Sequence, residues 1–206
     1  IYPKDLLAPA ARRRAKFAPY LEAIVGPHAD DRRVLAWDLC NEPQFRRHKP
    51  EALRAESDWL AELYDRCKRL GAKAPLTVGA LGAQVHGLAG LEHVAPLSDL
   101  LSIHPYWFGP GRPPDRPTFE KYLDDYVAFA RKVNKPLLAT ETCWGALDDR
   151  QRVANVRYTL GELKKRGIGW LAYLLYTSRV ADAHGPELGP VGGPGNLAFV
   201  QLDGTL

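Results

Sequence analysis

The sequence predicts a parallel α/β fold, and three observations carry that prediction. Short apolar runs without polar alternation recur along the chain, and amphipathic segments of helical periodicity separate them. Strands of this kind are typical of sheets buried on both faces, and helical crossovers join parallel strands. The composition, 46% hydrophobic and 25% charged, is that of a globular protein with a sizeable core. A doubly wound sheet and an eight-stranded barrel are the common architectures that fit.

The apolar periodicity predicts five strands and four helices. Strands are expected over residues 34–39, 75–80, 100–104, 137–140 and 169–176, and helices over 11–25, 51–70, 119–134 and 148–166. In the segment 51–70, Leu53, Leu60 and Leu63 share one face, and Gly71 has the position of a C-terminal stop. Asp148 has the position of an N-cap. The 206 residues favour a single domain, residues 1–206.

Charge and hydropathy narrow the possible partners. The net charge is +4, and the arginine clusters at 12–14, 32–33 and 46–47 have no interleaved aromatic residues, as a groove for single-stranded nucleic acid would need. No apolar run reaches the ~18 residues of a membrane span. We therefore expect neither a nucleic-acid partner nor a membrane. A signal peptide would lie outside this chain, so the localisation stays open between secreted and cytoplasmic.

Cysteines and glycines give no indication of a cofactor. Cys40, Cys67 and Cys143 are odd in number and far apart, which fits buried free thiols better than a metal site or a disulfide framework. The chain has no glycine-rich phosphate loop, so a nucleotide cofactor is not expected either.

Two glutamates lie at the carboxyl ends of buried strands. Active-site residues of parallel α/β folds are found at these strand ends. Glu42 comes just after the strand 34–39, between Asn41, whose amide can bind a ligand hydroxyl, and Pro43, which holds Glu42 extended. Glu141 ends the strand 137–140. Two carboxylates at one rim suit glycoside hydrolysis, in which one donates a proton and the other attacks the anomeric carbon. They also suit metal binding, so their positions alone leave both chemistries open.

Aromatic and imidazole side chains occupy the same strand ends. His104 and Tyr106 follow the strand 100–104, and Tyr106 could donate a hydrogen bond to a carboxylate. Trp107 offers a flat apolar face for a sugar ring, with ordinary packing in the core as the alternative, and Trp144 follows the strand that Glu141 ends. On the last strand, Trp170 and Tyr176 share one face and Tyr173 has the other, unless a bulge intervenes.

Taken together, these motifs resemble glycoside hydrolase clan A, in particular its family 5 cellulase-like enzymes. The resemblance rests on WDLCNEP at 37–43, SIHPYW at 102–107, LLATETCWG at 137–145 and GWLAYLL at 169–175, in the order found in the clan. The closing AFVQLDGTL at 198–206 is similar to the segment that follows the final strand of such domains.

This resemblance implies a function and a set of roles. Glu42 is similar to the general acid/base and Glu141 to the nucleophile of a retaining enzyme, so their carboxyl groups should lie ~5 Å apart. Asn41 and His104 correspond to sugar-binding residues, and Tyr106 to the donor that orients Glu141. Trp107, Trp144 and Tyr173 complete the expected substrate contacts. The substrate would be an oligo- or polysaccharide, with cellulose, β-mannan, mixed-linkage glucan and small glycosides all compatible, and no metal or cofactor would be needed.

The chain also departs from the family pattern. It matches the fourth to eighth strands of a (β/α)8 barrel, so the first three βα units, with an Arg and a His of the sugar site, are missing. Tyr173 stands where the family usually has Trp, and Cys40 where an aromatic residue is common. We therefore expect an incomplete TIM barrel, a fragment of a larger enzyme with little activity alone and with aggregation-prone open sheet edges.

Two other function classes remain open from the sequence. A carbohydrate-binding barrel that has lost catalysis would keep the aromatic surfaces but would not need both carboxylates. A metal-dependent barrel hydrolase would use Glu42, His104 and Glu141 as ligands, although such sites usually have further His and Asp residues at strand ends.

Overall fold

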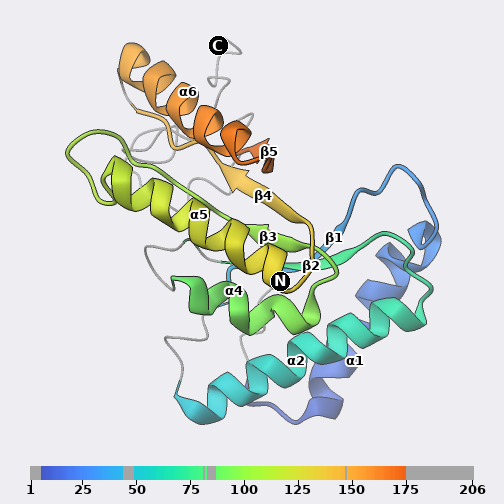
Figure 1. Ribbon diagram of the computed structural model, residues 1–206. Helices are drawn as coiled ribbons and strands as arrows, with labels where there is room; N and C mark the ends of the chain where they lie inside the picture. Colours follow the sequence, from blue (N-terminus) through green and yellow to red (C-terminus); the bar gives the residue numbers. More distant parts are fainter. Residues whose placement is uncertain (1–5, 44–48, 81, 83–86, 147, 175–206) are drawn as a thin grey trace.

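The fold is an α/β fold of the (β/α)8 TIM-barrel type that is incomplete, with five parallel strands (Figure 1). The computed structural model describes residues 6–43, 49–80, 82, 87–146 and 148–174. The strands are β1 (Trp37–Asn41), β2 (Leu76–Ala80), β3 (Leu101–Ile103), β4 (Leu137–Thr142) and β5 (Gly169–Ala172). Their order in the sheet equals their order in the chain, and each pairs in parallel with the next.

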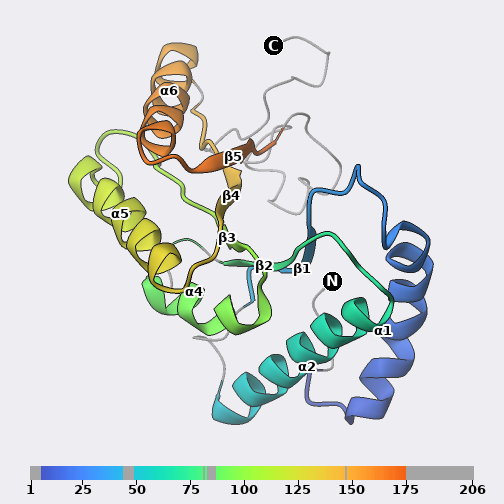
Figure 2. The ribbon, with the colours of Figure 1, turned by 45° about the vertical axis from the view of Figure 1, so that its right-hand side comes forward.

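The helices decide between the two architectures that the sequence left open. They are α1 (Ala10–Ile24), α2 (Pro50–Arg69), α4 (Leu88–Val94), α5 (Arg116–Lys132) and α6 (Asp149–Lys165), with short 3₁₀ helices at Gly26–His28 and Ala95–Leu97. Figure 2 shows these helices in an arc along one side of the sheet. A doubly wound fold has helices on both faces and a reversal of strand order, so the barrel type is the one observed.

Several element boundaries differ from the sequence expectation for local reasons. β1 begins at Trp37 rather than residue 34, because Val34 is held in a turn by a hydrogen bond from its N–H to the Asp31 carbonyl (3.1 Å). α5 begins three residues early, because the Asp115 side chain accepts from the Thr118 N–H (2.9 Å) and caps the helix there.

Other differences concern elements that the periodicity did not resolve. Helix α4 was not predicted, because its seven residues are too few to display a clear helical repeat. β5 ends at Ala172, and the remainder of the expected strand, including Tyr176, lies outside the described residues, as does the closing segment 198–206.

The core lies between the central strands and the helices. Every residue of β2 and β3 is buried, and both are inner strands of the sheet with a paired strand on either side. α2 contributes the buried side chains Trp59, Leu60 and Leu63, close to the face predicted from its periodicity. Full burial of each such apolar side chain stabilises the fold by ~1.5–3 kcal/mol.

The three cysteines are buried free thiols, as predicted. Loss of hydration on burial raises the pKa of Cys40 to about 12 and that of Cys143 to about 11, so both are neutral packing groups at ordinary pH. Among the helices of the described segments, none has the length and apolarity that crossing a membrane demands.

The two edge strands contrast with this core. All four residues of β5 are exposed, and Trp170 and Leu171 retain 42% and 49% of their accessible surface. Leu35, just before β1, is 65% exposed. In the described part of the chain, the sheet therefore ends in two open edges instead of closing on itself.

Candidate active site

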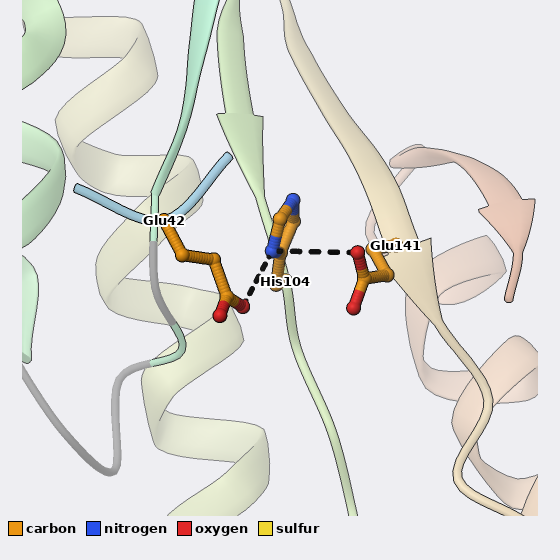
Figure 3. A group of neighbouring side chains, drawn as sticks. All are labelled: Glu42, His104 and Glu141. Atoms are coloured by element: carbon orange, nitrogen blue, oxygen red, sulfur yellow. Dashed lines mark hydrogen bonds and ion pairs between the residues drawn. The ribbon is translucent and has the colours of Figure 1, made fainter. Parts of the chain in front are cut away.

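The carboxyl ends of β1, β3 and β4 bring Glu42, His104 and Glu141 together (Figure 3). One ligand atom from each of these side chains lies within 4.8 Å of the other two. Figure 3 shows the His104 ring between the two carboxyl groups, with Nδ1 facing both. His104 and Glu141 follow Glu42 by 62 and 99 positions in the chain. The three residues meet because the parallel strands that carry them end at the same rim of the sheet.

Glu42 stands directly after β1 in an unusual backbone conformation. Its φ is +50°, in the left-handed region that residues other than glycine seldom adopt, so the expectation that Pro43 holds Glu42 extended is wrong. Its N–H donates to the carbonyl of Gly79 on β2 (2.9 Å), which fixes this turn to the neighbouring strand. The turn directs the carboxyl group to His104, whose Nδ1 lies 2.7 Å from Oε1. Strained backbone of this kind is common at functional sites.

His104 is the most enclosed member of the group, with 2% of its surface exposed. Its Nδ1 lies 2.7 Å from Glu42 Oε1 and 4.0 Å from Glu141 Oε2. Its Nε2 lies 3.2 Å from Thr140 Oγ1, which in turn is hydrogen-bonded to the Ser102 hydroxyl. Both ring nitrogens therefore have partners, and the tautomer depends on which neighbour donates.

Glu141 lies within β4 and has a different partner. The Tyr106 hydroxyl donates to Glu141 Oε1 at 2.6 Å. Burial, together with the nearby charge of Glu141, raises the pKa of Tyr106 well above its ordinary value, so the phenol stays a donor. The Thr142 hydroxyl donates to the Pro105 carbonyl (2.6 Å), which ties the end of β4 to the segment that carries His104 and Tyr106.

Aromatic rings line the Glu141 side of the site. Trp144 is half-buried and packs edge-on against Tyr106, with ring centroids 5.5 Å apart. Phe108 stacks on Tyr106 (6.4 Å) and meets Trp144 edge-on (4.7 Å). The Tyr173 N–H donates to the Thr142 carbonyl (2.9 Å), one residue after Glu141, and loss of hydration, with the charges of Glu141 and Glu42, raises the pKa of Tyr173.

The expectation of an open stacking face at Trp107 is corrected by the structure. Its side chain is only 2% exposed and packs against Tyr158, with centroids 4.4 Å apart, while the Arg116 guanidinium lies 5.2 Å from its ring. Successive residues of extended chain point to opposite sides, so Tyr106 faces Glu141 and Trp107 enters the helical layer. Trp107 is therefore a core residue. Asn41, at the end of β1, is exposed beside Glu42.

Four residues near the site were not singled out from the sequence. Thr140 contacts His104, and Phe108 contacts Tyr106. Asp38 accepts from the Gly79 N–H (3.0 Å), and Gly79 lies against His104. Thr140 could have been predicted to lie near the site, because it directly precedes Glu141 at the end of a strand. The approach of Gly79 to His104 depends on sheet register and has no signal in the sequence.

Comparison with known proteins defines the class of fold. No protein-family model matches the chain, and no curated protein matches it. Among solved structures, a GH2 β-galacturonidase from Eisenbergiella tayi matches 95% of this chain with a TM-score of 0.68 at 15% identity. A β-glucuronidase from Faecalibacterium prausnitzii matches 91% (TM-score 0.63, 16% identity), and an endo-1,4-β-D-mannanase from Thermotoga petrophila matches 78% (TM-score 0.60, 16% identity).

The chain therefore has the fold of TIM-barrel glycoside hydrolases. It spans only part of these similar proteins: 35% of the galacturonidase, 32% of the glucuronidase and 53% of the mannanase chain. The similarity thus concerns the portion of the barrel that bears Glu42 and Glu141.

Proposed function

We propose that this chain is the part of a retaining β-glycoside hydrolase that carries both catalytic carboxylates. The observation that supports this most directly is that carboxylate oxygens of Glu42 and Glu141 approach within 4.8 Å. Retaining enzymes need their two carboxyl groups about 5–5.5 Å apart, whereas inverting enzymes leave about 6.5–9.5 Å for a water molecule. The substrate is an oligo- or polysaccharide, and family 5 is the family we assign.

In this proposal Glu141 is the nucleophile. Its Oε1 accepts the Tyr106 hydrogen bond, which stabilises the ionised form, and its Oε2 attacks the anomeric carbon to form a glycosyl-enzyme. The glycosidic C–O bond breaks as the new C–O bond forms. Glu42 donates its proton to the departing oxygen and then takes a proton from the water that releases the sugar.

The remaining side chains bind and orient the sugar. Asn41, exposed beside Glu42, is assigned to the 2-hydroxyl of the sugar. His104 holds the Glu42 carboxyl group through its 2.7 Å contact. Trp144 and Tyr173 supply walls for the ring, and Tyr173 does so with a narrower surface than tryptophan. The proposal needs no metal and no cofactor.

We also propose that three further βα units complete the barrel in the full protein, so that residues 1–206 form part of one catalytic domain. The support is that β1 and β5 each have a strand on one side only among the described residues, with exposed Leu35, Trp170 and Leu171. Long unpaired edges favour association with other strands, so the chain alone should have little activity and should aggregate. Genomic sequence upstream of Ile1 that encodes no such units would contradict this part of the proposal.

The proposed function is tested by the stereochemistry of the reaction. The chain, extended by any upstream βα units, is incubated with β-glucan, β-mannan and aryl β-glycosides, and ¹H NMR follows the product anomers. The β-anomer should form first. If the α-anomer forms first, the mechanism is inverting and the proposal is wrong.

A metal-dependent hydrolase is the second candidate, because Glu42, His104 and Glu141 could each offer one ligand to a divalent ion. Metal analysis of the purified protein, and activity after treatment with a chelator, separate the two candidates. A barrel that binds sugar without hydrolysing it is the third, and it predicts binding of oligosaccharides by calorimetry with no product under any condition.

A further inference from the structure

The site has a third carboxyl group, Asp38 of β1, for which the proposed mechanism has no role. Asp38 Oδ1 accepts two backbone hydrogen bonds, from Gly79 (3.0 Å) and from Cys40 (3.2 Å). The residue as a whole is exposed, because β1 is an edge strand. Its carboxyl group is nevertheless surrounded by protein atoms, and this loss of hydration raises the pKa of Asp38 against the opposing effect of its hydrogen bonds and of His104.

Gly79 is the point at which Asp38 approaches His104. A methyl group at Gly79 would lie 2.8 Å from Asp38 Oδ2 and 3.0 Å from His104 Nε2. Asp38 Oδ2 and His104 Nε2 therefore border the same small space, which is open because Gly79 has no side chain. The second oxygen of Asp38 therefore lies no more than 5.8 Å from His104 Nε2, the nitrogen that points away from Glu42, and the two groups interact through their charges.

The His104 ring consequently has acidic groups on both sides. Nδ1 faces Glu42 Oε1 at 2.7 Å and Glu141 Oε2 at 4.0 Å, while Nε2 faces Thr140 Oγ1 at 3.2 Å and the Asp38 side. When the hydrogen is on Nε2, the ring donates a hydrogen bond to Thr140, and the unprotonated Nδ1 can accept a hydrogen bond from the protonated carboxyl group of Glu42. With hydrogen on Nδ1, Glu42 can only be the ionised acceptor.

We propose that Asp38 is a positioning residue that favours the Nε2–H tautomer of His104, so that Glu42 keeps the proton it delivers to the leaving group. Its negative charge stabilises a hydrogen on the near nitrogen, and Gly79 provides the space for that approach. This inference rests on the proposed role of Glu42 as general acid.

The variant Asp38→Asn separates charge from structure. Asparagine keeps an acceptor oxygen for the N–H groups of Gly79 and Cys40 and replaces the second, charged oxygen with a neutral NH2 group, whereas Asp38→Ala removes the whole carboxyl group. The first measurement is ¹⁵N NMR of the histidine-labelled protein, extended by any upstream βα units, with His104→Asn to assign the ring signals. The wild type should have the Nε2–H tautomer, and Asp38→Asn should shift the population toward Nδ1–H. An Nδ1–H tautomer in the wild type, or unchanged signals in Asp38→Asn, would overturn the proposal without any assay of activity.

The second measurement compares aryl glycosides with poor and good leaving groups. Asp38→Asn should lower kcat about tenfold for the poor leaving group, which needs the proton, and leave KM and the rate with the good leaving group unchanged. If kcat fell equally for both substrates, or for neither, Asp38 would have a structural role only. If no glycoside is hydrolysed by any form of the protein, the proposed function fails, while the NMR result still decides whether Asp38 controls His104.

Discussion

Glu42 and Glu141 are the same residue type at the same rim, but their surroundings differ. Glu42 follows the edge strand β1 with a φ of +50°, and its partner is an imidazole that can accept or donate a proton. Glu141 lies inside β4, between two paired strands, and its partner is a tyrosine hydroxyl that only donates to it.

The difference matches the two roles that we propose for one type of side chain at one rim. A hydroxyl donor stabilises a carboxylate, which suits a nucleophile that must stay ionised. An imidazole acceptor can stabilise a protonated carboxyl group, which suits an acid. In hydrolases of known mechanism, environments that separate two titratable groups in this way define the acid and base assignments.

The largest effect is expected for Glu141→Gln. The amide cannot attack the anomeric carbon, so hydrolysis should fall to the background rate for every substrate, whatever its leaving group. Steady-state rates with activated and unactivated glycosides measure this. Glu92→Gln, at an exposed position on α4, is the matched control and should retain full activity. Substantial turnover by the Glu141 variant would remove the contrast between the two carboxylates.

A smaller and selective effect is expected for Glu42→Gln. Loss of general acid catalysis should slow substrates with poor leaving groups by about 10²–10⁴-fold. Substrates with very good leaving groups should still form the glycosyl-enzyme, and added azide should restore their turnover. Comparing rates with and without azide tests this selectivity. If azide also restored the Glu141 variant with the same product stereochemistry, the two roles would have to be exchanged.

Tyr106→Phe should have an intermediate effect. It removes the 2.6 Å hydrogen bond to Glu141, and a hydrogen bond to a charged group contributes ~1.5–3 kcal/mol, so kcat/KM should fall about 10- to 100-fold. Because the pKa of Tyr106 is raised above its ordinary value, no alkaline loss of activity below about pH 10 should come from this tyrosine. Tyr126→Phe, a buried tyrosine of α5, is the control. Equal rates in the two variants would mean that Tyr106 does not assist Glu141.

The smallest effect is expected for Gly79→Ala. The added methyl group would meet Asp38 Oδ2 at 2.8 Å, so the free energy of unfolding should fall by ~1–3 kcal/mol. The methyl group would displace Asp38 and His104, and through His104 it would affect Glu42. The contact between Tyr106 and Glu141 should stay in place. Denaturant unfolding measures this change. Gly161→Ala on α6, where nothing lies within 4 Å of the new methyl group, should instead stabilise by ~0.4–1 kcal/mol. Stabilisation at both positions would show that the space beside Gly79 is not needed.

The sequence predicted the strands well because apolar runs are a local pattern, and it placed Glu42 and Glu141 at strand ends. The apolar runs marked all five strands, and parallel pairing then brought Glu42, His104 and Glu141 to one rim. The orientation of Trp107 was not predicted, because an aromatic residue after a strand can face either the site or the core. The approach of Asp38 to His104 depends on the register of β1 against β2 and on the size of Gly79, which no local pattern encodes.

The central claim, that Glu141 is a nucleophile beside an acid/base Glu42, is tested most directly by covalent trapping. A 2-deoxy-2-fluoro glycoside with a good leaving group should form a long-lived ester on one carboxylate, since its second step is slow. Peptide mass spectrometry of the labelled protein should find the sugar on Glu141, and Glu141→Gln should remain unlabelled. A label on Glu42, or hydrolysis of natural substrates without any trappable ester, would contradict the account.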